Sequence, residues 1–452
     1  MLSFGGKQTR HCSGVTRRDV LTIGTGIAGL SLAHLLASEA KPQPAQTPGQ
    51  VLGRRPKSII YIVLAGGISH IDTWDMKPDA PAEYRGEFKT IHTRLPGEQI
   101  CELFPQQARI FDKLALLRGV RSVENDHFLS EVYTGLARTA GQRPAFGSVV
   151  SNLHGGVRGL PAYVSLSRPS DDRFEFERPY YAGAGHAPFR PFGEALENLA
   201  PVRDLARLED RKTLLRTFDT LRRDLDSTGT LEGMDRHHAQ ALTMITSPRV
   251  RDAFDLSKEP TKLVERYGRG KYTHQAVKDL LYDWSGKPFL QARRLVEAGV
   301  RVVTLTVGSW DHHSGPTQHI FQSYRHVLPA LDQSIFALVT DLESRGLSDD
   351  VLVVVLSEFG RTPKLSQPGP GREHWADAGC VLLYGGGLKM GQVIGATDRR
   401  AEYPREGKLN FQNLMATFYH VLGVDVEAKL PDFTGRPQQL LDERQPIAAL
   451  VG

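Results

Sequence analysis

Three short, continuous runs of apolar and mostly β-branched residues constrain the fold of this chain more than any other feature. They cover residues 58–64, 302–307 and 351–356, and small residues (Ala65, Gly308 and Ser357) follow them. Strands that are buried on both faces have this pattern, and such strands are typical of parallel sheets covered by helices. We therefore expect the three runs to lie in the interior of one sheet.

Helical patterns precede the second and third runs. Residues 291–299 read as a helix that ends at a glycine, and residues 330–345 carry leucine, isoleucine and valine at helical spacing. A further strand is expected at 381–384, and a helix at 411–422 with Gly423 as its stop. Alternating helices and strands predict an α/β domain with a doubly wound, mostly parallel sheet and helices on both faces.

The domain is expected to span residues 58–445, because nothing inside this range has the composition of a linker. Residues from about 201 to 273 are polar and rich in helix-forming residues, so they predict a helical insertion or cap. The sequence does not indicate an oligomeric state.

The N-terminal segment 1–40 has the layout of a twin-arginine export signal. Arg17 and Arg18 stand directly before an apolar run at 20–37, and small residues around Ala40 suggest cleavage there. The run contains glycines and is shorter than the roughly 20 residues that span a bilayer, which argues against a permanent anchor. After a Pro/Gln/Gly-rich linker at 41–57, the mature protein is expected in the periplasm or outside the cell.

The same run contains Gly24, Gly26 and Gly29, which spell the G-x-G-x-x-G pattern of dinucleotide-binding proteins. That motif requires a strand before the glycines and a βαβ unit after them. Basic residues precede the glycines here and a linker follows them, so the export signal is the favoured interpretation.

Charge and cysteine content exclude two other classes. The formal net charge of +5 comes partly from basic residues in the signal and linker, so the mature chain is near neutral and nucleic-acid binding is not indicated. Of the three cysteines, Cys12 lies in the signal. A disulfide framework is therefore excluded, although a single bridge between Cys101 and Cys380 is left open.

Potential metal ligands follow each of the three apolar runs, at the strand ends where open α/β sheets bind their ligands. They include Asp72, Asp311 with His313, Glu358, and, further along, His374. Mixed oxygen and nitrogen ligation suits Zn, Mn or a harder ion such as Ca. Each residue alone is better explained as a turn former or helix cap, but their shared position favours one polar site. Asp75 and Asp377 are read as turn or capping residues, whereas His312 and His319 stay unassigned.

At these motifs the chain resembles domain of unknown function family 1501 (DUF1501) of the alkaline phosphatase and sulfatase superfamily. The segments that carry the resemblance are the twin-arginine start and residues 64–73, 78–86, 308–313, 357–363 and 395–398. The resemblance covers nearly the whole length. It implies an alkaline-phosphatase-like fold and a bound divalent metal.

The resemblance also assigns ligand positions. Glu358 occupies the place of a ligand aspartate, while Phe359 replaces the histidine that follows it in the superfamily. Asp311 and His313 resemble the pair that serves the other metal, and His374 the late histidine that completes it. Asp72 becomes a ligand on a longer loop.

The nucleophile is where the chain departs from the superfamily. Thr134 and Gly135 resemble the Thr-Gly pair behind the nucleophile, but the corresponding position falls on residues 125–127, which have no hydroxyl or thiol. Ser122 and Ser130 flank it. The sulfatase Cys-x-Pro-x-Arg motif is absent, so a metal-bound hydroxide or an alternative nucleophile is expected instead of a formylglycine.

The leading hypothesis is an exported, metal-dependent hydrolase of phosphate or sulfate esters, acting on a small-molecule or polysaccharide ester. Asp126 or His127 would be the general base or an extra ligand, and Arg361 would clamp the anionic group. An ion pair, with Glu358 as partner, is an equally good interpretation of Arg361. The expected metal ligands are Asp72, Asp311, His313, Glu358 and His374. The alternative function is a non-catalytic binding or assembly protein of the cell envelope, which Asn125 and Phe359 would favour.

Overall fold

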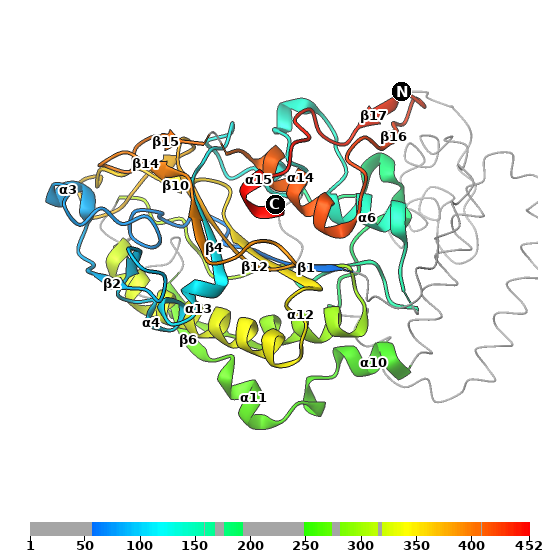
Figure 1. Cartoon of the computed structure of the whole chain (residues 1–452), viewed down its shortest axis with the longest axis horizontal. Helices are drawn as coiled ribbons and strands as arrows, with labels where there is room; N and C mark the ends of the chain where they lie inside the picture. Colours follow the sequence, from blue (N-terminus) through cyan, green and yellow to red (C-terminus); the bar gives the residue numbers. More distant parts are fainter. Residues whose placement is uncertain are drawn as a thin grey trace, which may run out of the picture.

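The structure of the protein is a computed structural model, which describes residues 57–157, 159–167, 176–192, 248–273, 281–314, 319–407 and 409–452 (Figure 1). The predicted export signal at 1–40, the linker up to residue 56 and most of the predicted insertion lie outside the described residues.

A seven-stranded sheet forms the centre of the described chain, in the order β13-β4-β12-β9-β1-β8-β5. Four of its six neighbouring pairs are parallel, and only β12 runs against both of its neighbours. The predicted α/β fold with a mostly parallel sheet is therefore confirmed, and the three apolar runs are the adjacent strands β9, β1 and β8. The strands are β1 (Ser58–Val63), β4 (Leu114–Val120), β5 (Tyr163–Ser165), β8 (Val302–Thr306), β9 (Val351–Leu356), β12 (Gly379–Gly385) and β13 (Gln392–Ile394).

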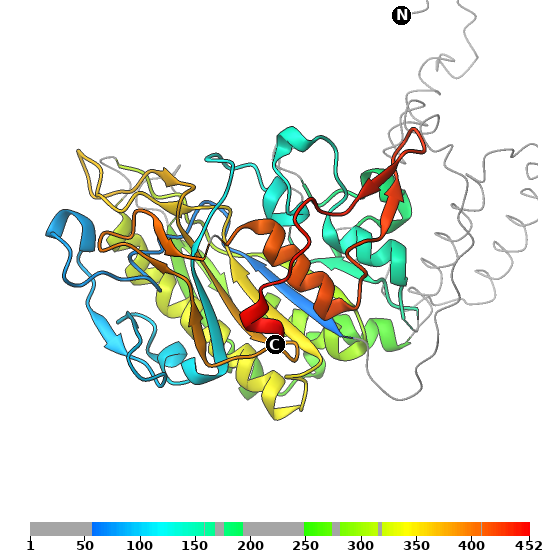
Figure 2. The same cartoon turned by 45° about the horizontal axis from the view of Figure 1, so that its top comes forward.

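Helices cover both faces of this sheet because successive side chains of a strand point to opposite sides. Ile60 and Ile62 of β1 belong to one hydrophobic cluster, together with buried residues of α12 (Lys287–Ala298) and α13 (Ile320–Ser344). Ile59 and Tyr61 belong to a second cluster, with α6 (Phe146–His154) and α14 (Phe411–Leu422). Figures 1 and 2 show α12 and α13 on one side of the sheet and α14 on the other.

The remaining elements are short helices and two-stranded pieces around the sheet. The helices are α3 (Ala82–Arg85), α4 (Pro105–Ala108), α5 (Ser130–Thr134), α10 (Pro248–Phe254), α11 (Thr261–Arg266) and α15 (Ala448–Val451). The antiparallel pairs are β2 (Thr90–His92) with β3 (Gln99–Cys101), β6 (Arg269–Thr273) with β7 (Leu281–Ser285), β10 (Gly360–Arg361) with β11 (His374–Trp375), β14 (Ala396–Thr397) with β15 (Pro404–Glu406), and β16 (Lys429–Pro431) with β17 (Pro437–Gln439). The described end of the predicted insertion thus contains α10 and α11 and closes in a strand.

Several local predictions can be compared with these bounds. α14 has the expected limits and ends at Gly423, and α12 ends at Gly299 as expected. α13 begins at Ile320, ten residues before the predicted start at 330, and continues through Pro329. The unassigned His319 is its N-cap. Strand β4 was not predicted, since Arg118 and Gly119 interrupt its apolar pattern.

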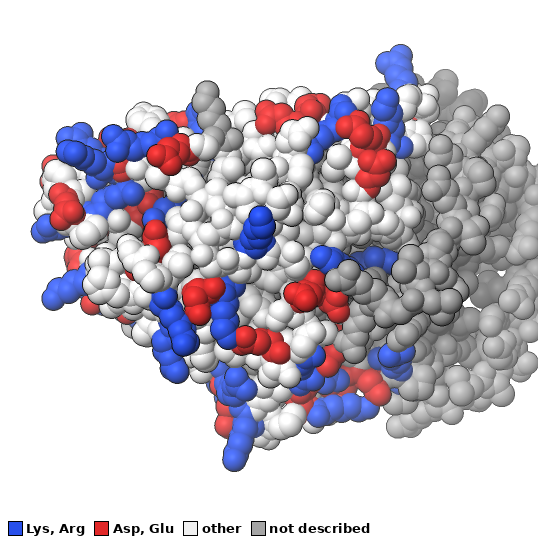
Figure 3. Space-filling view, in the orientation of Figure 1, with Lys and Arg blue, Asp and Glu red and all other residues white. Residues whose placement is uncertain are grey.

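No helix among the described residues is both long enough and apolar enough to cross a membrane. Cys101 and Cys380 are buried and both are free thiols, so they do not form the bridge that the sequence left open. Acidic and basic side chains are interspersed over the face of the molecule seen in Figure 3.

Candidate metal centre

Four segments meet at the carboxyl end of the central strands. The loop after β1 contains Gly66 and Gly67, and the loop after β8 carries Asp311 and His313. Beyond β9, the short strand β10 pairs with β11, which places His374 beside Arg361 in register. The loop after β4 supplies His127.

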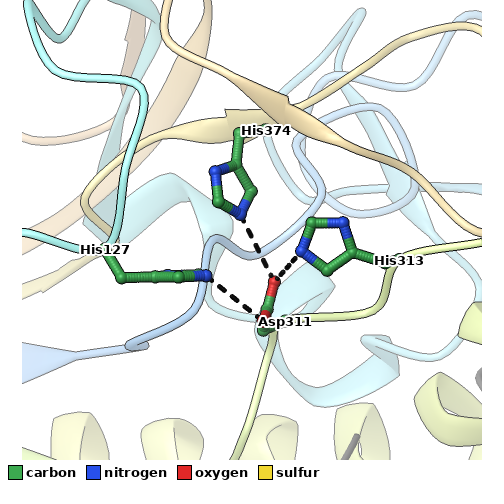
Figure 4. Close-up of side chains that lie close together, drawn as sticks. All are labelled: His127, Asp311, His313 and His374. Carbon is green, nitrogen blue, oxygen red and sulfur yellow. Dashed lines mark ion pairs between the residues drawn. The ribbon is translucent and has the colours of Figure 1, made fainter.

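These segments bring three imidazoles around one carboxylate (Figure 4). Donor atoms of His127, Asp311, His313 and His374 all lie within 4.8 Å of one another. From the Asp311 carboxylate, the Nε2 atoms of His127, His313 and His374 are 3.2, 2.7 and 3.6 Å away. Three nitrogens and one carboxylate, at this mutual distance, form a donor set that fits a divalent metal ion.

The second nitrogen of each ring contacts an acceptor of the protein. Nδ1 of His127 lies 3.1 Å from Oε1 of Glu358, and Nδ1 of His374 lies 3.0 Å from the carbonyl oxygen of Asn125. Nδ1 of His313 contacts the Glu373 carboxylate. When Nδ1–H donates to such an acceptor, the Nε2 lone pair is left for a metal, and this arrangement is usual for metal-binding histidines.

One buried polar atom of the cluster lacks a hydrogen-bond partner among the described residues. Nε2 of His374 is buried without a hydrogen-bond partner, and it faces the Asp311 carboxylate at 3.6 Å. A buried polar atom without a partner is costly, so a ligand that satisfies it stabilises the site. The side chains of His127 and His313 are 27% and 30% exposed, which leaves the cluster open to solvent on one side.

The close packing of these side chains shifts their pKa values. Burial alone would raise the pKa of Asp311, but hydrogen bonds from His127 and His313, the nearby His374 and the charge of Arg361 hold it well below its usual range. Burial opposes protonation of His127, yet contacts with Asp311 and Glu358 raise the pKa of its imidazole to about 9. The hydrogen bond with Asp311 also raises the pKa of His313. Metal binding must therefore displace protons.

Arg361 lies beside Asp311, and protein acceptors surround its guanidinium. Its guanidinium is fully buried and donates to the carbonyl oxygens of Gly66, Gly67 and Arg372 and to the carboxylate of Asp311. This geometry does not favour the predicted role of Arg361 as a clamp for a substrate anion, because the group is buried and its donors face protein acceptors. The ion-pair alternative holds, with Asp311 as partner in place of Glu358.

Asp72 does not join the cluster. Its two oxygens lie 2.6 and 2.9 Å from the Arg372 guanidinium, the hydroxyl of Ser69 donates to it at 2.6 Å, and both charged side chains are fully buried. A carboxylate held in this way already has its charge compensated. The structure therefore favours the predicted ligand Asp72 as a partner of Arg372, outside the cluster of donor atoms.

Glu358 lies beside the cluster and contacts it only by way of the His127 ring, whose Nδ1 is 3.1 Å from its Oε1. Its Oε1 also accepts the N–H of Gly66 at 2.7 Å, and its Oε2 accepts the hydroxyl of Ser357 at 2.9 Å. Asp126 is exposed and accepts the backbone N–H of His127 at 2.7 Å. The structure therefore places His127 inside the cluster, with Glu358 directly behind it and Asp126 at the surface.

The hydroxyls of the two flanking serines donate hydrogen bonds to other protein groups. Ser130 donates to the carbonyl oxygen of Leu136 at 2.8 Å, and Ser122 donates to the carboxylate of Glu131 at 2.6 Å. Neither is a member of the cluster. Sequence reasoning gave no role to Glu373 or Arg372, although both stand directly before His374; their proximity to that histidine was the available signal.

The fold and the site define this protein as an α/β protein with a candidate centre of three histidines and one aspartate. The chain belongs to the family described as "Protein of unknown function (DUF1501)", which it matches over residues 56–451. No curated protein matches its sequence.

Among solved structures, the chain is similar to a sulfatase from Pseudoalteromonas sp., with 11% identity, a TM-score of 0.37, and coverage of 87% of this chain and 73% of that one. It is also similar to a protein in the alkaline phosphatase superfamily from Vibrio parahaemolyticus, with 10% identity, a TM-score of 0.37, and coverage of 91% and 78%. A phosphonate monoester hydrolase from Silicibacter pomeroyi matches with 12% identity, a TM-score of 0.33, and coverage of 84% and 75%.

Proposed function

We propose that this protein is an exported, metal-dependent hydrolase of phosphate or sulfate esters, acting on a small-molecule or polysaccharide substrate. The observation that carries the proposal is the convergence of three imidazole Nε2 atoms on Asp311, each ring held from behind by a protein acceptor. A divalent ion bound there would act as a Lewis acid on the ester and lower the pKa of water.

The proposed work of the chain's own residues follows from their positions. Asp311, His127, His313 and His374 hold the ion, and Arg361 fixes the Asp311 carboxylate from below. Of the two roles that the sequence left open for His127, general base or extra ligand, we assign it that of a ligand because its Nε2 faces the cluster. Asp126, exposed beside His127, is the proposed proton acceptor at the rim.

Metal analysis of the purified chain tests the centre. The wild-type protein is expected to retain a divalent ion after gel filtration, and the double variant Asp311→Ala/His313→Ala is expected to lose it. His92→Ala is the matched control, because His92 is exposed on β2, outside the cluster, and its loss should leave metal content unchanged. Equal metal content in the double variant and wild type would disprove the site.

A turnover screen separates hydrolysis from the alternative function. Aryl phosphate and aryl sulfate esters are offered to the protein with Zn²⁺, Mn²⁺ or Ca²⁺, and Asp126→Asn is expected to lower kcat without changing metal content. Retained metal with no turnover of any ester would favour a non-catalytic binding or assembly protein of the cell envelope.

Export is tested separately from chemistry. Lysines in place of Arg17 and Arg18 are expected to keep a tagged full-length chain in the cytoplasmic fraction, because the twin-arginine route reads that pair. Unchanged export of the variant would reject this route.

A further inference from the structure

Two carboxylates next to the centre, the predicted ligand Glu358 and Glu373, already have other hydrogen-bond partners. Glu358 is 3% exposed, and both of its oxygens accept hydrogen bonds, from Gly66, His127 and Ser357. Glu373 contacts His313 with one oxygen and lies 3.3 and 3.2 Å from the backbone nitrogen and hydroxyl of Ser314 with the other. Neither carboxylate is a member of the cluster of donor atoms.

An apolar ring closes another side of the cluster. Phe359 is 4% exposed, and its ring centroid lies 4.4 Å from that of His374 at an interplanar angle of 31°, and 5.4 Å from that of His127. The edge of the ring is packed so closely against Gly67 that a Cβ there would come within 2.4 Å of it. Aromatic carbons provide no ligand atoms, so this side of the cluster offers nothing to a second ion.

The charge of the donor set also favours a single ion. The donor set contains a single carboxylate, and the guanidinium of Arg361 already contacts it. Hard ions such as Ca²⁺ need six to eight oxygen ligands, whereas imidazole nitrogens suit Zn²⁺ and its first-row neighbours. Three nitrogens and one oxygen match a four-coordinate transition ion and are a poor match for calcium.

From these contacts we infer that the centre takes one first-row transition ion of the Zn²⁺ type, and that Glu358 and Glu373 are positioning residues that orient His127 and His313. This inference rests on the proposed metal centre and specifies its ion class, its stoichiometry and the role of its carboxylates. Ca²⁺ is excluded as the resident ion, and the Glu358 predicted as a ligand acts through His127.

Titration of the metal-free full-length chain with Co²⁺ and Zn²⁺ tests the inference. We expect one ion per chain, and no displacement by a thousand-fold excess of Ca²⁺. In Glu358→Gln, the stoichiometry should stay at one while the affinity falls by roughly 10–100-fold, because the amide orients His127 less well. Glu343→Gln is the control, since Glu343 makes only an exposed ion pair with Lys113, and its affinity should not change.

Three results would overturn the inference: two ions per wild-type chain with comparable affinities, displacement by Ca²⁺, or complete loss of binding in a folded Glu358→Gln. Folding is checked by circular dichroism of the metal-free proteins. Ester turnover, measured on the same samples, distinguishes a failure of the single-ion centre from a failure of the proposed hydrolase. Turnover with two bound ions would reject only the single-ion centre, and one bound ion without turnover would reject only the hydrolase.

Discussion

Replacing Arg361 by glutamine removes a buried positive charge that four protein groups share. In wild type the guanidinium donates to the carbonyl oxygens of Gly66, Gly67 and Arg372 and pairs with Asp311. Glutamine is shorter and neutral, so it leaves the Asp311 carboxylate to the histidines alone and two or more carbonyls without a donor. Breaking a buried ion pair by removing one partner costs about 3–5 kcal/mol.

That loss converts into a measurable shift of the melting temperature. With an unfolding entropy of about 2.1 cal/mol/K per residue, roughly 400 residues give about 0.8 kcal/mol/K. A loss of 3–5 kcal/mol therefore lowers Tm by about 4–6 °C. The assay is differential scanning calorimetry of the metal-free proteins at pH 7, followed by a metal titration in which Arg361→Gln should also bind more weakly.

The matched control is Arg325→Gln. Arg325 pairs with Glu87 at 2.9 Å, but both side chains are about half exposed, so the pair contributes at most about 1 kcal/mol and Tm should change by roughly 1 °C or less. If Arg361 were instead a substrate clamp, its loss would raise KM while Tm and metal affinity stayed at wild-type values. That outcome would refute the positioning role.

Three further predictions follow from the same contacts. Because the pKa of His127 is raised to about 9 from an ordinary 6.5, its protonation stabilises the metal-free fold at pH 6.5, and this contribution disappears as the pH rises through 9. The Tm of the metal-free protein, measured in thermal scans, should therefore fall over that pH range. His127→Gln should flatten the dependence of Tm on pH. Gly66→Ala places a Cβ 2.7 Å from the backbone nitrogen of Asp311 at a φ of +107°. The substitution should therefore lower the free energy of unfolding, measured by calorimetry, by more than about 1 kcal/mol and weaken metal binding. Unchanged metal affinity would argue against this close approach. Burial raises the pKa of the Cys101 thiol to about 12 and that of Cys380 as well, so neither should react with a thiol reagent at pH 8 until urea unfolds the chain, and rapid modification of the native protein would contradict their burial.

The central strands were predictable because their signal is local. Strands β1, β8 and β9 are six or fewer residues long, and each is a short run rich in apolar, β-branched residues, so composition within a few positions is enough. Helix α14 was equally clear from its spacing and its terminal Gly423. Strand β4 gave no such signal, and the reversed direction of β12 depends on pairing with β9 and β4, which no local pattern expresses.

The site was predictable in outline but not in its details. The sequence alone determined the sheet's inner strands and the polar residues after them, because strand propensity and the position of strand-end loops are properties of short segments. Only the tertiary structure decided which partner each charged group meets. Asp72 and Asp311 look alike in the sequence, yet Arg372, 300 positions away, pairs with the first, while the second meets its neighbour His313 together with His127 and His374 from distant segments. A carboxylate's chemistry depends on the charges within a few ångströms of it, and those are set by folding rather than by its neighbours along the chain.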